Sequence, residues 1–346
     1  MLRRERDSII LDAQCALRID RDIYFFAKSA NALYVYNIDE NRTRLLSAIP
    51  GKDCFDKMMV SKILLYKDDL ILIPCFGHSV WTYNLLIQKW REIRINISNN
   101  KGIVSMQSFV WQDRIHIIGC NNPFSVVFDM KLNEAFYCHQ PYDILKDKMT
   151  NDTFFHSEYI KKNTHTVVMG CCCANWLMEY NLDSGKGTLV NTGVEISDVE
   201  GIAIWGDERI IAARTTHAVK YFRDGLWKDV ALPQDLLFVY LASVKYHENI
   251  MLLGKERGAS LVFRDGELVE TIDRAFYFCE KSDVGFITMD TNNQLIIVDK
   301  NTERTGECRI SLDEFFNMTG ELMTGYIIYE NESVMTIRDM IDTILK

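Results

Sequence analysis

The sequence predicts an all-β fold, a seven-bladed β-propeller of four-stranded antiparallel blades with a short C-terminal helix. The first of three supporting observations is a spacing, in which an acidic or amide turn residue precedes an aromatic and a second Asn or Asp by about fifteen residues. This spacing recurs with a period of roughly 44 residues, within the range of propeller repeats. Each repeat also divides into short strand-like runs separated by Asp- and Asn-containing turns.

Seven units carry the spacing along most of the chain. In chain order the matched positions are Asp22 with Tyr36-Asn37, Asp69 with Tyr83-Asn84, Asp113 with Phe128-Asp129, Asn163 with Tyr180-Asn181, Asp207 with Tyr221, Glu248 with Phe263, and Asp283 with Val298-Asp299. A repeat of this length that fills the chain favours one domain over two.

The second unit shows how four strands fit one repeat. Strands are predicted at 62–66, 70–73, 79–83 and 89–93, because each run is rich in apolar and β-forming residues and ends at a turn. A single sheet of this size cannot bury both faces, so the units should stack radially around an axis. The first strand of each unit is the more apolar and is expected innermost, while fourth strands such as 42–46 carry more charge and should form the rim.

The termini lie outside the repeats. Residues 1–14 form an N-terminal segment with a strand-like run at 8–11, residues 15–310 form the propeller, and residues 311–346 form a C-terminal extension. The extension holds a second strand-like run at 325–329, and either run could close the ring. A helix-capping pattern at 336–339 precedes an apolar stripe, which predicts a short helix packed on the ring or on a partner.

Glycines and Trp residues give the chain a resemblance to the kelch-type propellers. Second strands end in Gly at three places, and two units show an aromatic, a turn and a Trp; the residues are Gly119, Gly170, Gly254, Tyr83 with Trp90, and Tyr221 with Trp227. The resemblance covers about residues 15–310 and departs from the family pattern, because a single Gly replaces the Gly-Gly pair. It implies a propeller fold that can host either binding or catalysis.

Composition narrows the class of partner and the compartment. With 48% apolar residues the chain can bury a large core, and its net charge of −9 argues against nucleic acid or an anionic membrane as the main partner. It has no apolar run long enough to span a membrane and no secretory apolar region near its N-terminus. Three of its ten Cys residues are consecutive and no CxxC pair occurs, so we expect reduced thiols and a cytoplasmic location.

The long loops predict where a ligand would bind. Links at 49–60, 96–106, 139–156 and 193–200 should lie on the same face as the loops between second and third strands. The candidate ligand-binding residues on this long-loop face are His78, Asn121, Asn122, Trp176, Arg214, His217 and Arg257. Aromatic residues of the links, namely Phe55, Phe154, Phe155, Phe238 and Tyr240, are expected to add stacking surface.

Two functions fit these residues. The first is a non-catalytic binding or scaffolding module that presents the long-loop face to a protein or a glycan-like ligand. The second is a carbohydrate-active enzyme, an isomerase, lyase or hydrolase, with His78, Arg214, His217 and Arg257 around a central pocket. Charged residues on predicted inner strands, such as Lys62 and Glu280, could line the central channel. No cofactor and no metal are expected, since the spacing of His78, His156 and His217 is not diagnostic of a metal site.

Overall fold

The structure is a computed structural model that describes most of the chain. The described residues are 3–5, 8–27, 32–52, 60–96, 102–148, 154–155, 159–171, 176–191, 199–205, 208–213, 219–233, 236, 238–255, 258–282, 285–299, 302–311, 313–314, 326–328 and 334–336. The predicted C-terminal helix lies outside them. Within the described part no helix is long and apolar enough to cross a membrane.

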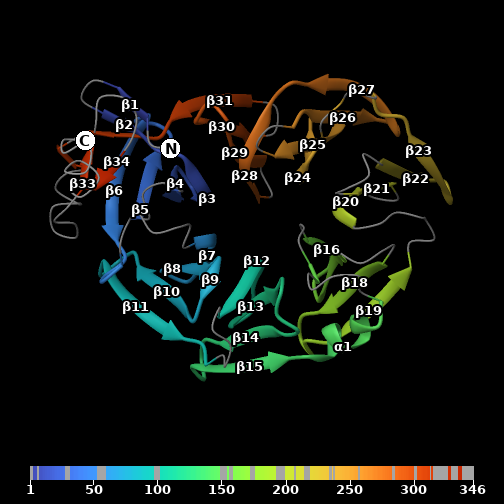
Figure 1. The fold of residues 1–346 in the computed structure, drawn as a ribbon, viewed down its shortest axis with the longest axis horizontal. Coiled ribbons are helices and arrows are strands. Elements are labelled where there is room, and N and C mark those ends of the chain that lie inside the picture. Colours follow the sequence, from blue (N-terminus) through green and yellow to red (C-terminus); the bar gives the residue numbers. More distant parts are fainter. Residues whose placement is uncertain are drawn as a thin grey trace, which may run out of the picture.

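Four-stranded antiparallel sheets follow one another around a common centre (Figure 1). We name each sheet by its first and last strands. The first three are β3 (Ala13–Ile19), β4 (Asp22–Ala27), β5 (Ala32–Asn37) and β6 (Arg42–Ala48); β7 (Val60–Tyr66), β8 (Asp69–Pro74), β10 (Ser79–Asn84) and β11 (Lys89–Arg94); and β12 (Ile103–Trp111), β13 (Arg114–Gly119), β14 (Ser125–Asp129) and β15 (Glu134–Cys138).

The same pattern continues through the rest of the ring. The sheets are β16 (Tyr159–Asn163), β17 (Thr166–Gly170), β18 (Trp176–Asn181) and β19 (Gly187–Asn191); β20 (Val199–Trp205), β21 (Glu208–Ala213), β22 (Val219–Arg223) and β23 (Leu226–Val230); β24 (Tyr240–Tyr246), β25 (Asn249–Lys255), β26 (Ser260–Arg264) and β27 (Glu267–Ile272); and β28 (Ala275–Ser282), β29 (Gly285–Asp290), β30 (Gln294–Asp299) and β31 (Thr302–Glu307). A short parallel contact between β25 and β28 joins the last two sheets.

The repeated Asp and Asn residues hold the hairpins of each sheet together. Asn84 Nδ2 donates to Asp69 Oδ1 at 2.7 Å, and Asn37 makes the equivalent bond to Asp22 at 2.7 Å. The Oδ1 of each Asn accepts backbone N–H groups of the following turn, as does Oδ1 of Asp129. The side chain therefore satisfies turn amides that no strand partner reaches, which explains why the spacing recurs.

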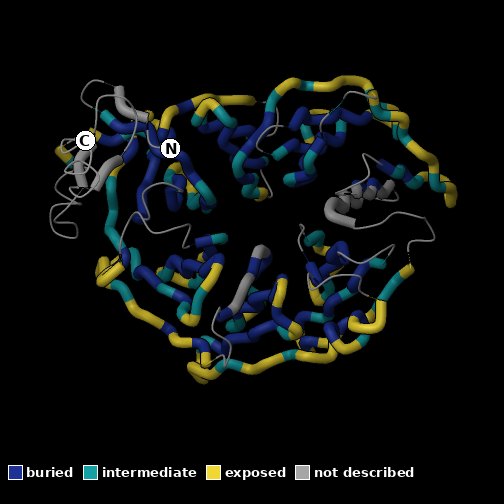
Figure 2. The backbone as a smooth tube through the Cα atoms, viewed as in Figure 1, coloured by how far each residue is buried: buried dark blue, intermediate teal, exposed yellow. Residues whose placement is uncertain are grey.

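Buried aromatic and aliphatic side chains form the core between neighbouring sheets. The aromatic residues of the repeat are buried, for example Tyr36 and Phe263 at 2% and 1% exposure. Second strands such as β8 and β13 are buried almost throughout, whereas first strands such as β16 are partly exposed (Figure 2). The first strands lie innermost, as expected, and are partly exposed because they border the central opening, while second strands have a hydrogen-bonded neighbour on each side (Figure 1).

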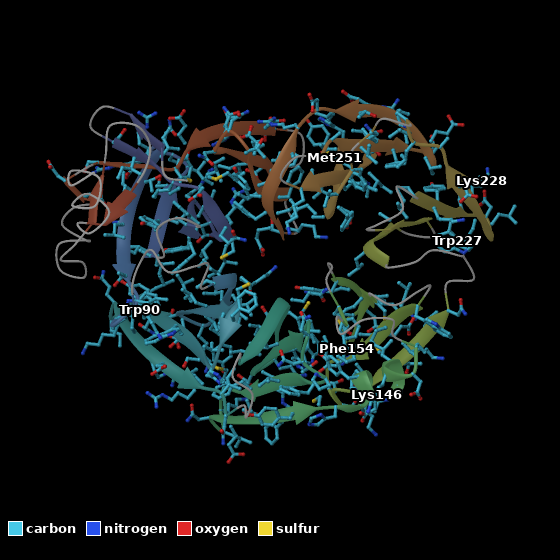
Figure 3. All side chains as sticks on the ribbon, in the orientation of Figure 1. Trp90, Lys146, Phe154, Trp227, Lys228 and Met251 are labelled. Atoms are coloured by element: carbon cyan, nitrogen blue, oxygen red, sulfur yellow. The ribbon has the colours of Figure 1, made fainter. Side chains whose placement is uncertain are left out.

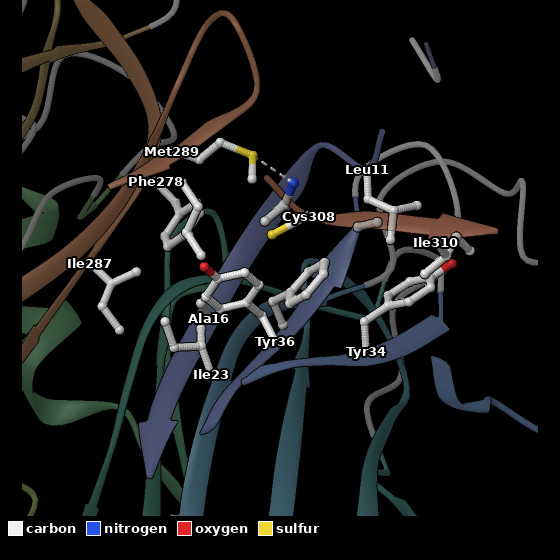
Figure 4. Packing of buried hydrophobic residues seen from close by; sticks show 14 of the residues in the cluster. Leu11, Ala16, Ile23, Tyr34, Tyr36, Phe278, Ile287, Met289, Cys308 and Ile310 are labelled. Carbon is white, nitrogen blue, oxygen red and sulfur yellow. Dashed lines mark hydrogen bonds between the residues drawn. The ribbon is translucent and has the colours of Figure 1, made fainter. Parts of the chain in front are cut away.

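A separate small sheet joins the two ends of the ring. Strand β2 (Ser8–Ile10) pairs with β32 (Arg309–Ser311) and with β1 (Arg3–Glu5), so the predicted run at 8–11 contacts the C-terminal side of the propeller. Leu11, Cys308 and Ile310 complete the core between the β3–β6 and β28–β31 sheets (Figure 4). The run at 325–329 behaves differently, because β33 (Tyr326–Ile328) pairs with β34 (Val334–Thr336).

The position of the Trp differs between the two units that carry the kelch-like spacing. In the β7–β11 sheet Trp90 lies opposite Tyr83, and their rings are 4.9 Å apart. In the β20–β23 sheet Trp227 lies opposite Phe222, not Tyr221, with a ring separation of 5.1 Å. The register of the two hairpins is the same, because Tyr83 and Tyr221 each lie opposite the seventh residue after them, Trp90 in one sheet and Lys228 in the other. Trp227 is only six residues after Tyr221, and neighbouring residues of a strand point to opposite faces. The two Tyr–Trp spacings are therefore not structurally equivalent.

Candidate functional site

The long-loop face over β8–β13 is built by an additional strand inside a loop. Strand β9 (Phe76–Gly77), between β8 and β10, pairs with the first residues of β12 in the neighbouring sheet, Ile103 opposite Gly77 and Val104 opposite Phe76. A further bridge joins Gly77 to Gly102. The loop between the second and third strands of one sheet is therefore fixed to the next sheet.

Glycine is required where these two backbones meet. Gly102 has φ +70°, and a Cβ atom there would lie 2.1 Å from the carbonyl oxygen of Gly77. The amide Nδ2 of Asn122 donates to Gly102 O at 3.1 Å, and Ile95 N donates to His78 O at 2.7 Å. These contacts fix the backbone on both sides of Phe76.

Phe76 is exposed at the centre of this rigid region. Its side chain keeps 60% of its surface accessible, although the backbone on either side is hydrogen-bonded. His78 and Asn121 are exposed on the same set of loops. The arrangement presents one aromatic ring and two polar side chains, which can contact an apolar side chain and hydrogen-bond its surroundings.

The other predicted site residues have different environments. Asn122 is buried, and its amide donates to Gly102 O, so it supports the loop backbone and is not itself exposed to a ligand. Trp176, at the start of β18, is half-buried beneath Lys148, whose Nζ lies 4.7 Å from the ring centroid. Arg214, His217 and Arg257 lie outside the described residues. The structure thus brings together His78, Asn121 and Asn122 around β9.

The aromatic residues expected from the links are mostly core residues. Phe154 and Phe155 pack on Tyr142 at ring separations of 4.9 and 5.5 Å, and Phe238 and Tyr240 are each 3% exposed. Tyr142 belongs to the helix α1 (Gln140–Lys146), which fills the link after β15. The expectation of exposed link aromatics was wrong for these four residues, because α1 and the neighbouring sheets cover them; Phe55 lies outside the described residues.

A second group of polar residues faces the central opening. Lys62 Nζ on β7 lies 3.0 Å from Glu280 Oε2 on β28, so this ion pair spans the inner strand β3 between them. The two side chains are 23% and 17% exposed. Burial alone would lower the pKa of Lys62, but the carboxylate of Glu280 reverses the effect and raises it, so Lys62 stays cationic.

Lys281 and Tyr159 complete the central group. Lys281 Nζ donates to Ser243 O at 3.2 Å. Burial, and secondly Lys62, lower the pKa of Lys281, and the shift is limited by the exposure of this residue to solvent. Burial raises the pKa of Tyr159, whose phenol is near both Lys62 and Glu280. The group offers an amine, a carboxylate and a phenol.

Neither a reactive thiol nor a metal-binding cluster is found among the described residues. Burial raises the pKa of Cys75 to about 11, so its thiol is protonated at neutral pH and is a poor nucleophile. Within the described ranges, no three His, Cys, Asp or Glu side chains gather in a way that could hold a metal ion.

Comparisons with known proteins show the fold. Similar structures include virginiamycin B lyase from Staphylococcus aureus (TM-score 0.60, 9% identity, 87% of this chain and 97% of that chain) and the β-propeller domain of Cps50 (Swd1) from Myceliophteria thermophila (TM-score 0.55, 9% identity, 84% and 96%). A chain from a crystal structure of the mitotic checkpoint complex also matches (TM-score 0.56, 10% identity, 87% of each). No family model and no curated protein matches the sequence. The chain has a β-propeller fold.

Proposed function

We propose that this chain is a non-catalytic binding or scaffolding propeller whose long-loop face contacts a protein partner, with Phe76 as the apolar anchor. The observation that carries the proposal is the 60% exposure of an aromatic ring on a backbone held by β9–β12 pairing. A rigid aromatic loses little conformational freedom on binding, which is why such residues dominate binding energy at interfaces. A glycan-like ligand stacked on the same ring is the other form of this proposal.

Finer features of the fold belong to the same proposal. A ring of seven blades is supported by the strand pairing from β3 to β31, and a kelch-like subtype by the Tyr83–Trp90 pair. The terminal helix on 336–346 and the domain boundaries at 14 and 310 remain part of the proposal. A cytoplasmic location is supported by the seven described cysteines, all of which are free thiols.

A bait experiment with a matched control tests the protein-binding function. Immobilised wild type is compared with Phe76→Ala and with Phe136→Ala, whose side chain is 44% exposed on the outer strand β15. We expect a set of cellular proteins that wild type and Phe136→Ala retain and Phe76→Ala loses. Retention of the same proteins by all three baits would contradict the proposal.

The carbohydrate-active enzyme is the second candidate, and the central group supports it. The Glu280 carboxylate and the Lys62 amine lie 3.0 Å apart on the inner strands β28 and β7, and such a pair could exchange protons with a sugar hydroxyl. Incubation with a panel of sugars and sugar acids, followed by product analysis, tests this. Turnover abolished by Glu280→Gln would favour the enzyme, whereas no turnover on any substrate would leave the binding function in place.

A further inference from the structure

An apolar cavity lies between the β24–β27 and β28–β31 sheets. Its volume is about 80 Å³, and its walls are made by side chains that include Met251, Leu253, Phe276, Phe286 and Val298 (Figure 3 labels Met251). All five are at most 6% exposed. The hydroxyl of Thr288, also on the wall, donates to Phe278 O, so it offers the interior no unpaired donor. The interior therefore suits a small hydrocarbon group.

The mouth of the cavity is polar and acidic. Tyr246 Oη donates to Glu303 Oε2 at 3.2 Å, and Glu303 Oε1 lies 4.0 Å from Arg274 Nη1. Arg274 already donates from Nε and Nη2 to Asp290 Oδ2, at 3.1 and 2.9 Å. Arg274 therefore faces two carboxylates, and Asp290, only 3% exposed, takes the shorter contacts, so the three groups together carry a net negative charge.

A second carboxylate adds to this negative charge. Burial raises the pKa of Tyr246, and the carboxylates of Glu303 and Glu270 add to the rise, which places both near the Tyr246 hydroxyl. Glu303 keeps 38% of its side chain accessible, so a ligand can reach it from solvent. An apolar cavity with an anionic mouth matches a molecule with a hydrocarbon body and one positive end.

We propose that this inter-sheet cavity binds a small primary ammonium ion, with its aliphatic body inside and its ammonium group on Glu303. The volume is about half that of an engineered apolar cavity that holds benzene, which indicates a body of about four carbon atoms. The site is separate from the long-loop face and from the central group, so it does not depend on the function proposed above.

The test uses isobutylamine, isobutanol and isobutyrate, which share a hydrocarbon body and differ in charge. The full chain is labelled with ¹³C at methionine methyl groups and titrated with each probe at constant ionic strength. Met251 reports on the cavity, and Met289, which packs in the core between the β3–β6 and β28–β31 sheets, is the internal control. We expect a saturable Met251 shift with isobutylamine, a weaker one with isobutanol and none with isobutyrate.

Two variants isolate the contribution of the charge. Glu303→Gln should weaken isobutylamine binding at least about fivefold and leave isobutanol unchanged, since a partly exposed ion pair is worth about that factor. Glu307→Gln on the same strand, where the side chain pairs with Arg309, should bind like wild type. The proposal is overturned if no probe moves Met251, if the three probes bind equally, or if Glu303→Gln binds isobutylamine like wild type.

Discussion

The two edges of the sheets use similar residue types for different purposes. One edge, here called the turn edge, carries the short turns, and there the side chains of Asn37 and Asn84 hydrogen-bond Asp22, Asp69 and the turn amides. The opposite edge, here called the loop edge, carries the long loops. There the bond from Asn122 to Gly102 O holds the backbone, while the side chains of Phe76 and His78 are exposed. The repeated polar residue therefore has a structural role here, and the proposed binding surface lies where the repeat is interrupted.

The largest expected contrast is between a buried aromatic beside the turn edge and the exposed one at the loop edge. Phe263 is 1% exposed, so Phe263→Ala should lower the free energy of unfolding by about 3–5 kcal/mol. Phe76→Ala should change it by less than about 0.5 kcal/mol. Urea denaturation of both variants measures this, and comparable losses would show that Phe76 also packs in the core.

The buried middle of the sheets should respond to acid. Burial, and secondly Arg114, lower the pKa of His116 to about 4, and its Nδ1 lies 3.3 Å from Tyr180 Oη. In the unfolded chain this imidazole protonates near its ordinary pKa of about 6.5, so the unfolded state gains protons first as the pH falls. His116 should therefore stabilise the fold fully above about pH 6.5 and lose up to about 3 kcal/mol of that stability towards pH 4.

Stability curves across this pH range test the contribution of His116. His116→Gln should flatten the curve between pH 6.5 and 4 relative to wild type. If the variant keeps the wild-type slope, other groups account for the acid sensitivity and His116 is not buried as a neutral ring.

A smaller contrast is expected between polar side chains at the two edges. Asn84→Ala should reduce the free energy of unfolding by about 1–2 kcal/mol, because Asp69 and two turn amides lose their partner. His78→Ala, at the loop edge, should cost less than about 0.5 kcal/mol because the side chain is exposed. Equal melting temperatures for the two variants would contradict the structural role given to the repeat.

The regular part of the fold was predictable because its signal is local and repeated. The repeat positions from Asp22 to Asp299 predict the order of the strands, because the two ends of each repeat spacing lie within one sheet. Features that depend on contacts between units were missed: β9 pairs with a neighbouring sheet, and Phe154 and Phe155 are covered by α1. His78 and Asn121 lie in loops between second and third strands, as predicted, but the exposure of Phe76 beside them depends on packing that spacing does not encode.

The position of Trp in two otherwise similar units shows a difference that the sequence does contain. Tyr83 and Tyr221 each lie opposite the seventh residue after them, but Trp227 is only six residues after Tyr221, so Lys228 takes the place that Trp90 has. A direct residue count across the two units could have revealed this difference. The inter-sheet cavity, in contrast, depends on side chains from separate sheets, and no sequence spacing indicates it.

The most direct test of the binding surface places a photoreactive phenylalanine analogue at position 76 or at position 136. Both native side chains are exposed aromatic rings, one at the loop edge and one on the outer strand β15. After irradiation in cells, we expect a discrete covalent adduct with another protein from position 76 and none from position 136. Adducts from position 136 alone, or from neither position, would contradict a partner on the long-loop face.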